Sequence, residues 1–209
     1  MTHHEPLIEA RLSKLRPTQI TVGRVEVATK RAQWASLKGK ERHRQLAAHW
    51  FPAVKGPDES HYIVDHHHLG LALQEEGVHT VWVMQLADLS ELERDVFWRM
   101  MEFRRWVHPF DHKGRRRGYD AIPVSIDGLR DDPYRSLAGR VRDAGGYAKD
   151  TEPYAEFLWA DFFRPRIDAA EIRSSAKANL APDLVARAVA LATGAAARYL
   201  PGWTGASEP

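Results

Sequence analysis

The sequence predicts an α/β (α+β) fold: a small mixed sheet packed with helices, followed by a helical C-terminal region. Residues 62–64 form a short apolar run that passes directly into a helical pattern, and residues 79–86 form a second strand-like run. A strand, helix and strand of this length favour a parallel or mixed sheet with a crossover helix. From residue 90 onward, helical spacing dominates. We therefore expect a core of residues 1–88 and a helical extension of residues 89–209, packed as one compact unit.

Composition limits the class of protein. The chain has 209 residues, of which 44% are hydrophobic, and this is enough for a proper core. A formal net charge of +2 is too small to demand a nucleic-acid partner. The absence of cysteine excludes disulfides and thiolate metal sites. No stretch approaches the roughly 20 apolar residues that span a bilayer, and we expect a soluble cytoplasmic protein without membrane partners.

The segments before residue 62 predict an irregular start to the sheet. Residues 15–23 have the character of an extended segment, Val25-Glu26-Val27 continue it, and a basic helix begins near Lys30. Residues 38–51 suit an amphipathic helix that ends at Pro52. A turn-rich loop, residues 54–60, then leads into the strand at residues 62–64.

The central motif is Asp65-His66-His67-His68, placed where the strand at residues 62–64 gives way to the helical pattern of residues 69–73. A helix N-terminus presents unpaired backbone N–H groups and the positive end of the helix dipole, and together these form an anion site. We expect Asp65 to cap the helix and the histidines to face the bound anion.

This motif resembles that of the ParB/sulfiredoxin superfamily, in which a strand followed by D-G-H-H-R opens a helix and holds nucleotide phosphates. Asp65, His67 and His68 match the family's acid and two histidines. His66 stands where the family usually has glycine, and Leu69 where it often has arginine. The variant D-H-H-H-L is similar to the branch called ParB-like nucleases, so the resemblance implies a small ParB/sulfiredoxin-like sheet.

The resemblance also implies a reaction. The segment around Glu26 resembles the first box of the fold, and Glu26 matches the acid that serves as base in the serine-kinase members. Catalytic roles then fall to Glu26, Asp65, His67 and His68, and phosphate contacts to His66 and Lys30. The expected activity is phosphoester hydrolysis (nuclease or nucleotidase) or phosphoryl transfer, on a nucleotide or a phosphorylated small molecule. Magnesium is expected with a nucleoside triphosphate.

Leu69 replaces a phosphate-binding arginine of the family, so another segment must supply the guanidinium. Residues 115–117 are three arginines in a glycine-flanked loop, and Arg116 is our candidate there. Arg135 lies in the first turn of the helix expected after Pro133. We favour Arg135 as the main phosphate contact, because a helix holds a guanidinium at a more constant distance than a loop does.

Three other interpretations stay open. As metal ligands, adjacent histidines are poorly spaced, because neighbours on a helix point about 100° apart and zinc needs its ligands on one face. As a purely structural feature, the motif would only cap a helix. As a non-enzymatic module, the chain would sense a nucleotide or grip DNA through residues 115–117. Sequence-specific DNA reading is not expected, because no helix-turn-helix follows.

The remaining chain is expected to be mainly helical. Ser90 to Glu93 have the spacing of a capping box, and the helix that they open carries an aromatic and methionine stripe as far as Trp106, which we assign to the core. Residues 122–126 suit a short extended piece. Further helices are expected over residues 133–145, over residues 153–164 and, as a pair interrupted near Pro182, over residues 168–199.

Overall fold

The structure, a computed structural model, describes residues 7–175 and 179–205, and these form two compact units. Unit 1 comprises residues 7–21, 27–111 and 116–130. Unit 2 comprises residues 22–26 and 112–115 together with the described residues from 131 onward. Each unit is therefore assembled from separate stretches of the chain. Whether residues 1–88 form a domain of their own stays a prediction.

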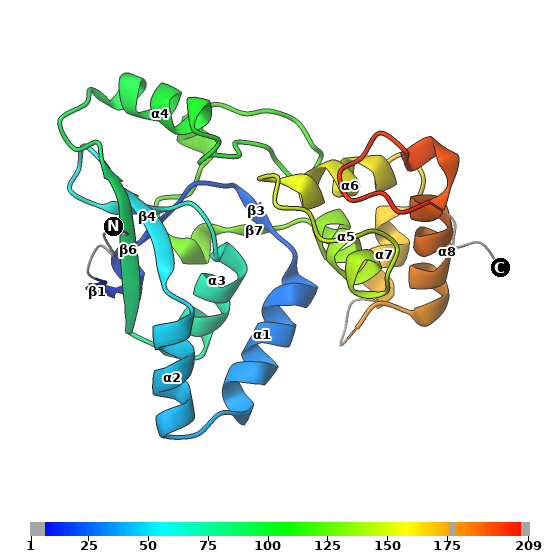
Figure 1. Ribbon diagram of the computed structural model, residues 1–209, viewed down its shortest axis with the longest axis horizontal. Helices are drawn as coiled ribbons and strands as arrows, with labels where there is room; N and C mark the ends of the chain where they lie inside the picture. The colour runs from blue at the N-terminus through cyan, green and yellow to red at the C-terminus, as the bar shows by residue number, and fades with distance from the viewer. Residues whose placement is uncertain (1–6, 176–178, 206–209) are drawn as a thin grey trace, which may run out of the picture. The chain divides into compact units, whose positions relative to one another are not determined.

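Unit 1 contains a five-stranded mixed sheet, and this confirms the predicted fold class (Figure 1). The strand order is β1 (Ile8–Arg11), β6 (Thr80–Asp88), β4 (Phe51–Lys55), β5 (His61–Ile63) and β2 (Arg16–Pro17). β4 runs parallel to β6 and β2 runs parallel to β5, whereas the β1–β6 and β4–β5 pairs are antiparallel. The helix α3 (His67–Glu75) connects β5 to β6; its C-cap is Glu76, and Gly77 follows with φ 72°.

β4 was not predicted. The helix expected over residues 38–51 is shorter, since α2 spans Lys40–Ala48, and Pro52 lies within a strand in the interior of the sheet. Proline cannot donate a backbone hydrogen bond, but its carbonyl still accepts one, here from the Val64 amide at 2.9 Å. The register shifts between Ala53 and Val54, as at a β-bulge, and such an irregularity accommodates proline in a sheet.

α1 (Arg24–Ser36) begins earlier than predicted, so Val25 to Val27 are helical and not extended. Its first amides are bound by side chains that are distant in sequence. The Arg24 N–H donates to Asp131 Oδ1 at 3.0 Å, and the Val25 N–H donates to Ser136 Oγ at 3.2 Å. Gly23 permits this approach, because a Cβ there would lie 2.8 Å from the Ser136 nitrogen. A start supported in this way leaves no local sequence signal.

α4 (Arg94–Phe103) carries the predicted aromatic and methionine stripe, although it begins and ends differently from the prediction. Ser90 bonds to Asp88 and does not cap the helix, and the helix ends before Trp106. Phe103, at its end, is 80% exposed. Three residues of the stripe lie in a buried cluster of unit 1, which comprises Ile20, Val54, Tyr62, Phe97, Trp98, Met101, Val107 and Ile122. Its assignment to the core is confirmed for Phe97, Trp98 and Met101.

Short elements fill the remainder of the first 131 residues. The extended piece expected over residues 122–126 is not a strand; the 3-10 helices Tyr119–Ala121 and Ile126–Gly128 lie on either side of it. A third 3-10 helix, Leu12–Lys14, follows β1. β3 (Thr21–Val22) and β7 (Arg130–Asp131) make a separate two-stranded sheet, and the chain passes between the units within these two strands.

Unit 2 is built around four helices: α5 (Pro133–Asp143), α6 (Ala155–Phe163), α7 (Ala169–Ser175) and α8 (Pro182–Thr193) (Figure 1). A short 3-10 helix, Ala195–Ala197, follows them. Asp132 caps α5: it is fully buried, and its Oδ1 accepts a hydrogen bond from the Tyr134 N–H at 3.0 Å. The core includes Val25, Leu137, Trp159, Phe163 and Leu184. No helix in the described part of the chain is long and apolar enough to cross a membrane.

Candidate functional site

The Asp65 to His68 turn lies where predicted, between β5 and α3 in unit 1. The N-cap of α3 is His66, and Asp65 stands one residue earlier. The prediction that Asp65 caps the helix is therefore wrong in detail. Asp65 is exposed, and its Oδ1 accepts the neighbouring His66 N–H at 2.6 Å, so the carboxylate stabilises the turn that leads into the helix.

His66 has a left-handed backbone, with φ 65° and ψ 20°. Glycine adopts this region without steric cost, and a residue with a side chain does so rarely. The observation explains physically why the family motif carries glycine at this position. The chain must enter α3 through a left-handed residue, whatever its side chain.

The His66 ring lies against Phe51, with centroids 5.9 Å apart, and its Nδ1 is buried with no hydrogen-bond partner among the described residues. Burial lowers the pKa of His66; Asp65 and a backbone hydrogen bond at Trp50 oppose this, and His49 and then Lys30 lower the pKa further. Lys30 thus acts electrostatically on the ring. The N-terminus of α3 and Lys30 supply positive potential, and His66 adds a buried ring nitrogen that has no hydrogen-bond partner among the described residues.

His67 is 3% exposed and forms a structural hydrogen bond. Its Nε2 accepts the Thr18 N–H at 3.0 Å, while Thr18 Oγ1 donates to the Ile63 carbonyl at 2.8 Å. Burial, and then the neighbouring rings of His68 and His66, lower the pKa of His67 to about 3. At neutral pH this ring is uncharged, so it offers no positive charge to a phosphate. This hydrogen bond links Thr18, the residue that follows β2, to the first residue of α3.

His68 lies in the first turn of α3 and is buried, and Lys30 lies on α1. Neither residue forms part of a metal cluster: within residues 7–175 and 179–205, no group of three or more histidine, aspartate or glutamate side chains is placed to hold a metal ion.

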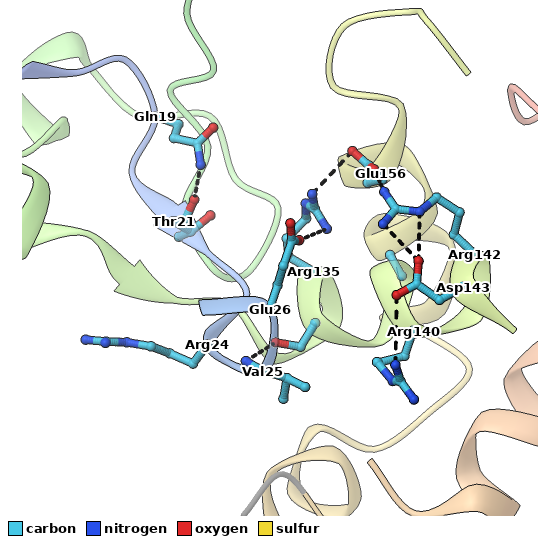
Figure 2. Close-up of polar contacts among 12 residues, drawn as sticks. Gln19, Thr21, Arg24, Val25, Glu26, Arg135, Arg140, Arg142, Asp143 and Glu156 are labelled. Atoms are coloured by element: carbon cyan, nitrogen blue, oxygen red, sulfur yellow. Dashed lines mark hydrogen bonds and ion pairs between the residues drawn. The ribbon is translucent and has the colours of Figure 1, made fainter. Parts of the chain in front are cut away.

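A second charged cluster, in unit 2, contains Glu26 and Arg135 (Figure 2). Arg135 Nη1 lies 3.5 Å from Glu26 Oε2, and Arg135 Nη2 lies 3.3 Å from Glu156 Oε2. The other oxygen of Glu156 contacts Arg142, which also binds Asp143 at 3.0 Å. Two of the predicted site residues, Glu26 and Arg135, are therefore in contact with each other. Glu156 was missed, because pairing between helices leaves no mark on local spacing, whereas Arg142 lies on the helix after Pro133 that was expected to supply a guanidinium.

Arg116, the predicted phosphate contact of the basic loop, is engaged in unit 1. Its Nη2 donates to Glu102 Oε1 and Oε2 at 2.9 and 3.0 Å, and its guanidinium lies over the Tyr119 ring at 5.5 Å. Glu102 also accepts the Tyr119 hydroxyl. Arg117 is 3.9 Å from Asp111. These contacts order the loop, and a phosphate contact by Arg116 stays a prediction.

Comparison with known proteins supports the family resemblance that was based on the Asp65 to Leu69 motif. The family model described as "Putative ParB-like nuclease" matches residues 8–165. This chain belongs to the ParB-like nuclease family. The match includes Glu26, the Asp65 to His68 turn and Arg135. The resemblance stated from the D-H-H-H-L motif is therefore confirmed.

A solved structure is similar to nearly the whole chain. The crystal structure of protein Atu1540 from Agrobacterium tumefaciens is 46% identical in sequence and superimposes with a TM-score of 0.87. The match covers 97% of this ParB-like chain and 99% of that protein. No protein in the curated set matches. The fold is thus shared beyond the family region, including the helical C-terminal part.

Proposed function

We propose that this member of the ParB-like nuclease family binds phosphate groups of a nucleotide or phosphorylated small molecule at the N-terminus of α3 and cleaves a phosphoester or transfers a phosphoryl group. The observation that carries the proposal is the left-handed turn at His66, where β5 leads into α3 and the buried His66 Nδ1 has no hydrogen-bond partner in the part of the chain that the structure describes. Helix amides, the helix dipole and a nearby lysine are the elements that bind phosphate in proteins.

The proposed roles follow from the chemistry of each side chain. Lys30 and His66 contact phosphate, His68 lies in the first turn of α3, and Glu26 serves as the general base that the family resemblance assigns. Asp65 is the exposed carboxylate at the turn, and it suits one coordination position of Mg²⁺, which takes its other ligands from phosphate and water. Magnesium would neutralise phosphate charge when bound with a nucleoside triphosphate.

Anion binding is tested by isothermal titration of the full chain with inorganic pyrophosphate. Lys30→Ala and His66→Ala should each weaken binding by about 1.5 to 3 kcal/mol, the range for a charge-assisted hydrogen bond. Lys40→Ala removes an exposed lysine of the same unit, on α2, and should leave affinity unchanged. Equal affinity in all four proteins would reject the α3 site.

Turnover is tested with a panel of nucleotides and phosphomonoesters, with and without magnesium. Glu26→Gln should lower kcat by about 10² to 10⁴-fold and leave affinity within a few-fold, because a general base acts on the transition state. An unchanged kcat would remove Glu26 from the mechanism. Pyrophosphate binding without turnover of any substrate would favour the non-enzymatic nucleotide-sensing module, and a steep salt dependence of DNA binding would favour nucleic acid as its partner.

A further inference from the structure

Arg135 is buried between carboxylates that come from two other helices. One terminal nitrogen faces Glu26 on α1 and the other faces Glu156 on α6, at 3.5 and 3.3 Å (Figure 2). The side chain is only 6% exposed, and its Nε and Nη1 have no hydrogen-bond partner among the described residues, so the contact between Nη1 and Glu26 Oε2 is an ion pair and not a hydrogen bond. The guanidinium also lies over the Phe157 ring, 5.6 Å from its centroid. Opposite charges and ring packing therefore fix its position, with little help from solvent.

Glu156 is held in turn by Arg142. The two oxygens of its carboxylate face different arginines, Oε2 facing Arg135 and Oε1 facing Arg142. Arg135 and Arg142 are seven residues apart, about two turns of α5, so both side chains leave the same face of that helix. Asp143 Oδ1 lies 3.2 Å from Nε and 3.0 Å from Nη2 of Arg142. Negative and positive side chains therefore alternate along a connected series: Glu26, Arg135, Glu156, Arg142 and Asp143.

We infer that Arg135 is a positioning residue that holds the Glu26 carboxylate in one orientation, and that Glu156 and Arg142 hold Arg135. The inference rests on the proposed function, in which Glu26 is the base. A cation beside a carboxylate favours its charged form, and a base must be charged to accept a proton. Both terminal nitrogens of Arg135 already face carboxylates, and this geometry suits support of Glu26 better than a direct phosphate contact.

The kinetic test is a double-mutant cycle measured with MgATP as substrate. Arg135→Gln should lower kcat at least about tenfold, while KM changes less than about threefold. The same substitution in a Glu26→Gln background should change kcat by less than about twofold, because the residue through which Arg135 acts is already disabled. Arg135→Lys retains the charge and should keep more activity than Arg135→Gln.

Two further variants set the controls. Glu156→Gln removes the anion that holds Arg135 and should lower kcat in the same direction, and it replaces Arg135→Gln as the test if that variant fails to fold. Arg187→Gln also breaks an arginine–glutamate pair of unit 2, with Glu171, at 2.6 and 3.1 Å. That pair is exposed and joins α7 to α8, so its loss should leave kcat unchanged.

A readout independent of turnover is the carboxyl ¹³C resonance of Glu26 in the labelled full chain, assigned by its absence from Glu26→Gln. It should titrate at higher pH in Arg135→Gln and Glu156→Gln than in the wild type, and at the same pH in Arg187→Gln.

An unchanged titration of this resonance in both Arg135→Gln and Glu156→Gln overturns the inference. So does an Arg135→Gln effect that is equally large with and without Glu26, or one confined to KM. A wild-type chain that binds pyrophosphate but turns over no substrate rejects the proposed function, and the resonance then decides the inference alone.

Discussion

At the scale of single residues, His66 holds a backbone conformation that suits glycine. Strain of this kind costs about 1 to 3 kcal/mol at a residue with a side chain. His66→Ala and His66→Gly both remove the imidazole and differ mainly in this strain. We expect the glycine variant to be the more stable of the two by about 1 kcal/mol, measured by urea unfolding.

His43 is the matched control, since it is an exposed histidine within a helix, α2. At that position the order should reverse, with His43→Gly less stable than His43→Ala by about 1 kcal/mol, because glycine weakens a helix interior. The same order of stability at both positions would show that the turn at His66 carries no strain.

His67 gives the protein a defined sensitivity to acid. Its pKa is about 3 in the folded state, whereas the ordinary value, which applies to the unfolded chain, is 6.5. The unfolded chain therefore gains a proton at this residue first as pH falls. The stability linked to the neutral ring is fully present above pH 6.5 and should be lost between pH 6.5 and 3, at up to about 1.4 kcal/mol per pH unit.

Urea unfolding at several pH values between 7.5 and 4 measures this loss. His67→Gln, which cannot gain the proton, should be less stable at pH 7.5 and should show a shallower pH dependence than the wild type. The exposed His43→Gln variant should retain the wild-type slope. Parallel curves for wild type and His67→Gln would contradict the assignment of a buried neutral ring.

The residue types of the α3 site could be predicted from sequence, but their states could not. A strand followed by polar residues and a helical pattern indicated the Asp65 to His68 turn, and that pattern is local. The burial of His67 depends on Thr18, which lies 49 residues earlier. A contact of that kind decides whether an imidazole carries charge, and the local sequence contains no sign of it.

At the scale of elements, the start of α1 depends on the close approach of Gly23 to α5. A Cβ at Gly23 would lie 2.8 Å from the Ser136 nitrogen and 3.0 Å from its Cα, and backbone atoms cannot move aside cheaply. Gly23→Ala should therefore destabilise the protein by about 1 to 3 kcal/mol, the usual cost of overpacking, measured by urea unfolding.

Gly139 provides the control within α5. A Cβ there would meet Arg135 Nη1 at 3.4 Å and Glu26 Oε2 at 3.8 Å, and these are ordinary contact distances. Gly139→Ala should leave stability unchanged or raise it by up to about 1 kcal/mol, because alanine suits a helix interior better than glycine. Similar losses in the two variants would show that the approach at Gly23 is not tight.

Elements with local markers were predicted well, and elements supported from a distance were not. Asp132 and Pro133 mark the start of α5, and Pro182 marks that of α8. α1 has no such marker, because its first two amides are bound by Asp131 and Ser136. Pro52 was interpreted as the end of a helix, although a bulge next to it lets the chain continue as a strand of the sheet.

At the scale of the whole molecule, the buried cluster of unit 1 contains residues from both sides of residue 88, the predicted domain boundary. Ile20, Val54 and Tyr62 belong to residues 1–88, and they pack with five cluster members from residues 97–122. The Tyr62 ring lies 4.8 Å from the Phe97 ring. A fragment of residues 1–88 should expose this surface and unfold without a cooperative transition, as followed by circular dichroism in urea.

A fragment of residues 1–130 is the matched comparison, because it contains all of unit 1. It should unfold cooperatively and give a dispersed NMR spectrum. A cooperative transition in the 1–88 fragment would instead support the domain division predicted from the sequence. Noncooperative unfolding of both fragments would show that unit 1 needs unit 2.

Unit 2 takes five of its residues, 22–26, from near the beginning of the chain and most of the others from residue 131 onward. The Val25 amide and the Ser136 hydroxyl that accepts its hydrogen are 111 residues apart. On a ribosome, α5 is synthesised on the order of ten seconds after the first turn of α1. During that interval Glu26 exists without the guanidinium and the serine that later surround its helix turn. A nascent or prematurely released chain should therefore carry the motif residues of unit 1 without the side chains that contact Glu26, and any activity that depends on Glu26 should be a property of the finished polypeptide.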